Sequence, residues 1–174
     1  IADNTYVEKL IVWSSDDLPL TVVDREFYDG LKRNASITHL DLQGDNIRNT
    51  PQNIAGGVGQ EILKAYQENN SHLTEIIIQN ASLQNWGENI IVATLRSCTN
   101  LQRVELNICN ITDAQLLPIV DAIRGHSMLE ELDLYDNNIG NAGCDAIATL
   151  LADPNYNLRT LYLGCNAVNN EGAT

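Results

Sequence analysis

One apolar pattern recurs along the chain, and self-similarity at a fixed period of about 20 to 50 residues constrains a fold more than any single motif. Its clearest copy, Leu129–Ile139, has the spacing L-x-x-L-x-L-x-x-N-x-I. A copy follows 29 residues later, and earlier copies stand at intervals of 28, 28 and 36 residues, with a degraded one 30 residues before these. The aligned residues are Ile37, Leu40, Leu42, Asp45 and Ile47; Leu73, Ile76, Ile78, Ala81 and Leu83; Leu101, Val104, Leu106, Cys109 and Ile111; Leu129, Leu132, Leu134, Asn137 and Ile139; and Leu158, Leu161, Leu163, Asn166 and Val168.

Each copy contains a short strand pattern. Successive side chains of a strand point to opposite faces, so the two apolar residues of x-L-x-L-x share a buried face and their neighbours face outward. A unit of this kind buries its apolar face only against the next unit. The pattern therefore predicts parallel strands at residues 8–13, 38–43, 74–79, 102–107, 130–135 and 159–164.

Helical segments are predicted between the strands, because apolar residues there recur at helical spacing. The segments are residues 59–66, 86–96, 115–124 and 141–152. Pro118 is tolerated best at the first helical position, so the third of these helices is expected to begin near Leu117. The longer interval of 36 residues points to an insertion near residues 49–59, which should bulge from the array.

The repeat resembles the leucine-rich repeat superfamily, and its period of 28 to 29 residues is similar to that of the ribonuclease-inhibitor-like subfamily. The resemblance covers about residues 7–172 and implies an α/β right-handed solenoid, with parallel strands on the concave face and helices on the convex face. It also implies that the Asn of each copy bonds neighbouring backbone groups, with Cys109 and Ala81 as buried replacements. Residues 1–174 would then form a single domain of about six repeats, the first degenerate and the last truncated where its helix begins. We expect the full-length protein to continue beyond it.

Charge excludes several classes of partner. The chain has 23 acidic and 10 basic residues, a formal net charge of −13 and a pI near 4.3. Such a negative field repels phosphate backbones and anionic lipid headgroups, so neither nucleic acid nor a membrane is an expected partner. The four cysteines match no metal or disulfide spacing and are interpreted as reduced thiols. We therefore expect a cytoplasmic protein, although N-x-S/T sequons at Asn34, Asn69, Asn80 and Asn110 would suit an extracellular one.

The outward strand residues predict where a partner binds. Acidic residues converge on the fourth and fifth repeats, and two tyrosines lie beside them. Aromatic residues surrounded by charges are typical of binding hot spots. The candidate contacts are Glu105, Glu130, Glu131, Asp133, Tyr135, Asp136 and Tyr162. The alternative is a solvated wall whose carboxylates only keep the protein soluble, and Arg103 and Arg159 at its edges would partly neutralise it.

The sequence lacks motifs for catalysis or for binding a metal or a cofactor. His39 stands near Asp41, but no Ser or Cys is placed to complete a nucleophilic pair. Residues 56–60, GGVGQ, lack the Lys-Ser/Thr ending of a phosphate loop. The other two histidines precede strands and are expected in solvent-facing loops. We predict no catalytic residue, no metal and no cofactor.

The predicted function is a non-catalytic protein-protein interaction module or scaffold, whose concave face binds another protein with a basic surface. Two alternatives come from the resemblance. GTPase-activating proteins of the Ran type also use such repeats and are acidic, and a GTP hydrolysis assay would identify this activity. Cytoskeletal caps of the tropomodulin family have a comparable number of repeats, and co-sedimentation with actin filaments would test that function.

Overall fold

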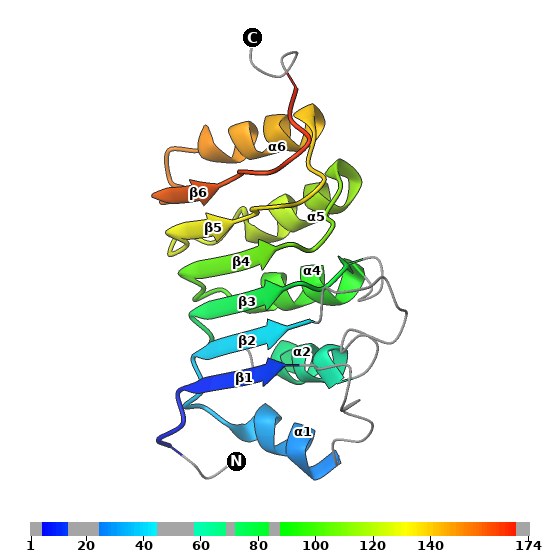
Figure 1. Ribbon diagram of the computed structural model, residues 1–174. Helices are drawn as coiled ribbons and strands as arrows, with labels where there is room; N and C mark the ends of the chain where they lie inside the picture. Colours follow the sequence, from blue (N-terminus) through cyan, green and yellow to red (C-terminus); the bar gives the residue numbers. More distant parts are fainter. Residues whose placement is uncertain (1–4, 14–24, 45–57, 69–71, 84–87, 170–174) are drawn as a thin grey trace.

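The structure is a computed structural model that defines residues 5–13, 25–44, 58–68, 72–83 and 88–169. These residues stack as units in which a strand on one side alternates with a helix on the other (Figure 1). The strands are β1 Lys9–Trp13, β2 His39–Gln43, β3 Glu75–Gln79, β4 Arg103–Asn107, β5 Glu131–Asp133 and β6 Thr160–Tyr162. The helices are α1 Arg25–Arg33, α2 Val58–Glu68, α4 Glu88–Ser97, α5 Asp113–Ile123 and α6 Asn141–Leu151. The predicted α/β solenoid is therefore confirmed.

The sheet is parallel and its strands follow chain order, β1 to β6. Leu10 pairs with Leu40 and Leu40 with Ile76, which is the register that the unequal sequence intervals predict. The degraded first copy thus forms a true strand. The last two strands are shorter than predicted, at three residues each, although pairing continues beyond β5 through the Leu134 N–H, which donates to Tyr162 O at 2.9 Å.

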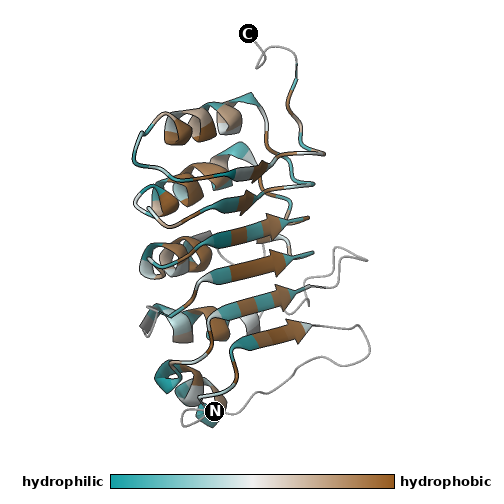
Figure 2. Cartoon of the chain, turned by 90° about the vertical axis from the view of Figure 1, so that its left-hand side faces the viewer, coloured by the Kyte–Doolittle hydropathy of each residue, from teal (hydrophilic) through white to brown (hydrophobic). Residues whose placement is uncertain are grey.

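The core runs as a continuous column between the sheet and the helices. Strand residues that face it are almost completely buried in the middle units, as for Leu40, Leu106 and Leu132, each 0% exposed. Hydrophobic and hydrophilic residues alternate along β2 and β4, as Figure 2 shows. At both ends of the column the corresponding residues are only partly buried, among them Leu10 and Leu161. Each unit is therefore covered by its two neighbours, as the repeat requires.

The Asn position ties each turn to the preceding unit. Asn137 is 6% exposed, and its Nδ2 donates to Leu106 O at 2.8 Å and to Leu134 O at 3.0 Å. Its Oδ1 accepts from the N–H groups of Cys109 at 3.1 Å and Ile111 at 2.9 Å. Cys109 occupies the same place one unit earlier, where its thiol donates to Ile78 O at 3.3 Å. Burial raises the pKa of the Cys109 thiol to about 12, so this cysteine is a structural, protonated group.

The residue just before this position is left-handed in four successive turns. These residues are Asn80, Ile108, Asp136 and Cys165, with φ of 54°, 54°, 52° and 57°. Asn and Asp tolerate this conformation, whereas a β-branched residue such as Ile108 is strained in it. The repeated geometry sets the direction in which the chain leaves the sheet, so Ile108 is held there by its neighbours in the array.

The prediction for Pro118 was wrong. Helix α5 begins at Asp113, so Pro118 lies inside it rather than at its first position. The Thr112 N–H donates to Gln115 Oε1 at 3.0 Å, a reciprocal cap that fixes the start of the helix upstream of the proline. The first helix of the chain, α1, was not predicted. The proposed insertion falls outside the described residues, except for Val58 and Gly59, which belong to α2.

The loop prediction for His126 was wrong, and one of the sequons is buried. His126 was expected in solvent, but it is 3% exposed and its Nε2–H donates to Leu95 O at 2.9 Å. Burial lowers the pKa of this imidazole, although hydrogen bonds to the backbone of Leu95 and Cys98 act in the opposite direction. Asn34, the first sequon residue, is 2% exposed, and its Oδ1 accepts from the Ile37 N–H at 2.9 Å, so a glycan does not fit there. None of the described helices is long and apolar enough to span a lipid bilayer.

Candidate functional site

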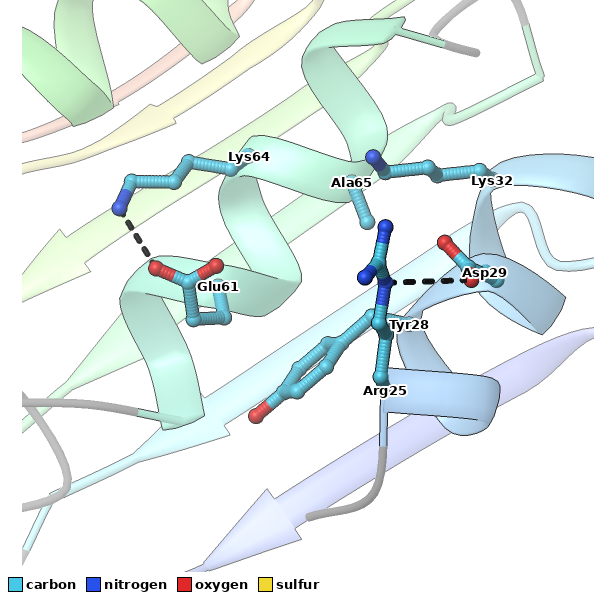
Figure 3. Close-up of a pocket in the computed structure, with 7 residues that line it drawn as sticks. All are labelled: Arg25, Tyr28, Asp29, Lys32, Glu61, Lys64 and Ala65. Carbon is cyan, nitrogen blue, oxygen red and sulfur yellow. Dashed lines mark hydrogen bonds and ion pairs between the residues drawn. The ribbon is translucent and has the colours of Figure 1, made fainter. Parts of the chain in front are cut away.

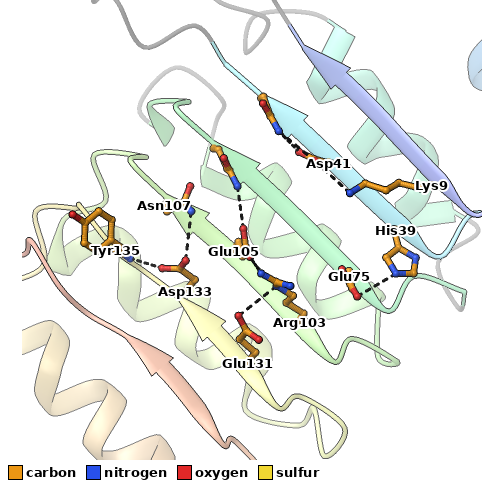
Figure 4. Close-up of polar contacts among 12 residues, drawn as sticks. Lys9, His39, Asp41, Glu75, Arg103, Glu105, Asn107, Glu131, Asp133 and Tyr135 are labelled. Carbon is orange, nitrogen blue, oxygen red and sulfur yellow. Dashed lines mark hydrogen bonds and ion pairs between the residues drawn. The ribbon is translucent and has the colours of Figure 1, made fainter.

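The concave wall consists of the outward side chains of the six strands, and a row of alternating charge crosses it (Figure 4). His39, Glu75, Arg103 and Glu131 are register partners on β2, β3, β4 and β5. His39 Nε2 lies 3.1 Å from Glu75 Oε1, and Arg103 Nε lies 3.4 Å from Glu131 Oε1. Opposite charges on neighbouring strands stabilise a sheet, so this row contributes to folding. On β6 the row ends at the uncharged Thr160, and Glu131 has a cation on one side only.

The central row of the wall contains two carboxylates that are almost buried. Asp41 is 6% exposed and pairs with Lys9 Nζ at 3.7 Å. Glu105 is 5% exposed, accepts from Gln79 Nε2 at 3.0 Å and forms an ion pair with Arg103. Burial by itself would lower the pKa of Arg103, but Glu105 and then the neighbouring glutamates raise it overall. Buried carboxylates that are satisfied in this way hold the sheet together rather than meet solvent.

Near the C-terminal end of the described sheet, the ring of Tyr135 packs over Gly164. A Cβ on Gly164 would lie 3.1 Å from Tyr135 Cδ2, so the ring rests directly on the glycine backbone. The Cys165 thiol donates to the Tyr135 hydroxyl at 3.2 Å, and Tyr135 is still 43% exposed. The pKa of this hydroxyl is raised by Cys165 first and, more weakly, by the charge of Asp136. Tyr135 is thus a rigid aromatic platform with an acidic neighbour.

Further acidic and aromatic groups surround this platform. Tyr162 is 47% exposed on β6, and its register partner is Asp133. Asp133 Oδ1 accepts from the Tyr135 N–H at 2.8 Å, which leaves Oδ2 with a single long contact, 3.5 Å from Asn107 Nδ2. Glu130 is half exposed, with a weak pair to Arg159 Nε at 3.7 Å. Surface pairs of this length contribute little, so these carboxylates are available to a partner.

His39 lies beside a hydroxyl and a carboxylate, as a catalytic histidine does, but the backbone N–H groups of Thr38 and His39 are already engaged. Its Nδ1 lies 2.7 Å from Thr38 Oγ1, and its Nε2 faces Glu75. The backbone N–H groups of Thr38 and His39 both donate to Glu8 O, at 2.9 and 3.0 Å. An acyl-transfer site needs free N–H donors for an oxyanion, and these two are already engaged. The geometry therefore favours a structural role for the pair.

The described residues offer little to a metal ion or a small molecule. Within the residues that the structure defines, no group of His, Cys, Asp and Glu could hold a metal ion. A groove of about 430 Å³ lies between α1 and α2, on the helical side (Figure 3). Two ion pairs line it, one of them Arg25 to Asp29 at 3.9 Å. The charges in the groove are largely balanced, so it does not favour one class of ligand.

Comparisons with known proteins agree with this architecture. Residues 125–148 and 155–174 match a family described as Leucine Rich repeat. A ribonuclease inhibitor of Mus musculus is 36% identical over 90 residues, and one of Sus scrofa is 24% identical over 178 residues. The chain has the leucine-rich repeat fold, and its repeats are similar to those of the ribonuclease-inhibitor-like type. The matches cover 51% and 85% of this chain but only 20% and 38% of the two inhibitors, so this leucine-rich repeat chain spans less than half of their length.

Other proteins match as well. The NACHT, LRR and PYD domains-containing protein 5 of Homo sapiens is 30% identical over 107 residues, covering 60% of this chain and 9% of that protein. Among solved structures, an internalin from Listeria monocytogenes aligns with 81% of this chain and 39% of its own, at 18% identity and a TM-score of 0.41. The repeat register of the sheet, rather than this weak overlap, carries the assignment.

The leucine-rich repeat array brings the seven predicted contact residues together on its last three strands and the adjoining turns. Glu131, Asp133 and Tyr162 lie on β5 and β6, and Tyr135 and Asp136 follow β5. Glu105, which was expected to be exposed, is instead buried and paired, because Arg103 and Gln79 reach it from the same and the neighbouring strand.

The sequence pattern missed the residues that support the tyrosine. Gly164 and Cys165 are needed to place the ring of Tyr135, one beneath it and one at its hydroxyl. Both stand in the unit after Tyr135, at the matching turn. Their positions were visible in the repeat alignment, but the contact itself depends on side-chain packing between units.

Proposed function

We propose that this chain is a non-catalytic protein-interaction module, and that its concave wall holds a partner over β5 and β6. The observation that carries the proposal is the immobilised, 43% exposed ring of Tyr135. A rigid aromatic side chain loses little conformational entropy on binding and is typical of the anchors of interfaces. Tyr162, 47% exposed on the next strand, extends the aromatic surface.

The proposed partner has a basic surface. Glu130, Asp133 and Asp136 place carboxylates beside the tyrosines; Glu130 has only the weak pair with Arg159, and Asp133 Oδ2 has only the long contact with Asn107. Such a patch attracts cations and accelerates association with a positively charged protein. Two relatives of this chain are named ribonuclease inhibitors, and on that likeness a basic ribonuclease is the first partner to test.

The test compares two double variants that change charge equally. Glu130→Lys with Asp136→Lys alters the patch, whereas Asp121→Lys with Asp145→Lys places the same charges on the exposed helical side. Calorimetric titration with a basic ribonuclease should show at least a tenfold loss of affinity for the first variant and a shallower salt dependence. The control pair should bind within about twofold of the parent chain, since distant rim charges contribute little.

Two further variants separate the aromatic from the acidic contribution. Tyr135→Ala should lower affinity at every salt concentration, because an apolar contact is not screened. Glu105→Gln should leave binding unchanged, since this side chain is 5% exposed. Equal affinity for the parent, the patch variant and Tyr135→Ala would refute the proposed surface, even if binding itself is observed.

A further inference from the structure

The central row of the concave wall contains carboxylates on β2, β4 and β5, and the first two have a cation beside them (Figure 4). Asp41 on β2 pairs with Lys9 Nζ at 3.7 Å, and Glu105 on β4 pairs with Arg103. Both acidic residues are almost buried, at 6% and 5% exposed. At these two positions the chain itself supplies the positive charge that each carboxylate needs.

Asp133 on β5 is the third carboxylate of the row, and it differs from the other two. It is the register partner of Glu105, but within the described residues no ion pair reaches it. The place that Arg103 occupies on β4 is taken by Glu131 on β5 and by Thr160 on β6. Asp133 is also partly exposed. A cation that compensates this carboxylate can therefore come from a partner.

The two oxygens of Asp133 are not equally available. Oδ1 accepts from the Tyr135 N–H at 2.8 Å, whereas Oδ2 lies 3.5 Å from Asn107 Nδ2, which is too long for a strong hydrogen bond. A guanidinium binds a carboxylate best through two parallel N–H···O bonds, one to each oxygen. An ammonium group is a compact point charge and needs only one oxygen. The single available oxygen of Asp133 therefore favours lysine over arginine.

Two tyrosine rings border the same position on the wall. Tyr162 is the register partner of Asp133, and Tyr135 follows Asp133 by two residues, so all three side chains lie on one face of the sheet. The rings are 47% and 43% exposed, and that of Tyr135 rests on Gly164. An ammonium group is attracted to the face of a tyrosine ring, and the methylene stem of lysine packs on apolar surface.

We propose that the position over Asp133, bordered by Tyr135 and Tyr162, takes one lysine side chain of the partner in preference to arginine. The ammonium group pairs with Asp133 Oδ2, and the methylene stem packs against the rings. The inference rests on the proposed function for the location of the interface, and it adds which side chain of the partner is recognised. The partner that fits is a protein with a lysine protruding from its basic surface.

Two peptides of equal charge, acetylated tetralysine amide and acetylated tetra-arginine amide, test the preference. Each is titrated at low salt into the chain with isotope-labelled tyrosine rings, and the ring signals are followed by nuclear magnetic resonance. Tetralysine should shift the signals of Tyr135 and Tyr162 and bind at least about threefold more tightly than tetra-arginine. Attraction to net charge alone would treat the two peptides alike. Equal affinity, or tighter binding of tetra-arginine, overturns the proposal.

Substitutions then locate the lysine. Asp133→Asn removes the charge but keeps an acceptor for the Tyr135 N–H, and it should lower the affinity for tetralysine at least about fivefold and abolish the preference. Asp145→Asn removes the same charge from the exposed helical side and should bind within about twofold of the parent chain. Tyr162→Leu should weaken tetralysine binding about threefold, whereas Tyr162→Phe, which keeps a ring, should not. A lysine preference that persists in Asp133→Asn overturns the proposal.

The inference and the proposed function fail in different ways. If a basic ribonuclease binds over β5 and β6 but the two peptides bind alike, the lysine preference is wrong and the proposed function stands. If the chain prefers tetralysine through Asp133 but binds no ribonuclease, that choice of partner is wrong and lysine recognition is supported.

Discussion

The buried amide of Asn137 gives the sharpest test of how the units are joined. Replacing it with alanine removes the acceptor for the N–H groups of Cys109 and Ile111, at 3.1 and 2.9 Å, which belong to the preceding turn. It also removes the donor to Leu106 O at 2.8 Å and to Leu134 O at 3.0 Å. The site is 6% exposed, so water does not replace these bonds without local opening.

The size of the effect follows from the two orphaned N–H groups. A buried donor left without a partner costs about 1 to 3 kcal/mol, and part of this is recovered as the turn relaxes. We therefore expect Asn137→Ala to lower the free energy of unfolding by about 3 kcal/mol. Asn137→Cys should cost less, because Cys109 occupies the same position in the preceding unit and its thiol still donates to Ile78 O.

Urea unfolding followed by far-ultraviolet circular dichroism measures this difference. With a slope of about 2 kcal/mol per molar urea, the midpoint should fall by roughly 1.5 M for Asn137→Ala. Asn138→Ala is the matched control, since this adjacent side chain is exposed, and it should cost less than about 0.5 kcal/mol. If Asn137→Ala and Asn138→Ala unfold at the same urea concentration, the amide does not join the units and the reasoning is refuted.

Three other predictions concern single positions. The free energy of unfolding should fall as the pH drops below about 6.5, because burial lowers the pKa of His126 in the folded chain and the unfolded chain then binds the extra proton. In urea titrations at several pH values, His126→Gln should flatten this pH dependence. His72→Gln, the control at an exposed histidine, should leave the pH dependence unchanged. Ile108→Asn should raise the free energy of unfolding by up to about 1 kcal/mol by relieving a φ of 54°, and a lower melting temperature would contradict this. Gly44→Ala should lower the free energy of unfolding by about 2 kcal/mol or more, since the added Cβ would lie 2.2 Å from Asn80 O. Gly125→Ala, whose Cβ would meet nothing within 4 Å, should be nearly neutral. Thermal unfolding followed by calorimetry measures both.

The fold could be predicted because each copy of the repeat has the same apolar spacing, so several copies indicate the same strand register. The spacing from Leu40 to Ile76 is longer than the others, yet the pairing followed the apolar pattern and not the interval. Helix ends were harder, since they depend on local side-chain contacts. The cap between Thr112 and Gln115 placed Pro118 within α5, and a rule based on proline alone could not anticipate that. His126 was misplaced for a similar reason, because its partner Leu95 O belongs to another unit.

The candidate site was predictable in position but not in the exposure of its members. Glu105 and Asp133 occupy equivalent places in adjacent units, and the sequence gives no reason to separate them. The difference lies with the side chains beside each carboxylate. Glu105 has Arg103 within its own strand and Gln79 on the neighbouring strand, whereas Asp133 has a long contact with Asn107 and Tyr162 on its other side.

The charge row of the concave wall ends beside the acidic patch. Across the strands, the row His39, Glu75, Arg103 and Glu131 alternates between basic and acidic residue types, and Arg103 lies between two glutamates. The alternation stops where Thr160 replaces the next cation, so Glu131 keeps unbalanced charge toward β6. In the central row, Tyr162 on β6 is the register partner of Asp133. The surface proposed to bind a partner thus lies where the lateral pairing ends, and a Thr160→Arg substitution, which would continue the row, should weaken binding of the proposed basic partner without lowering the melting temperature.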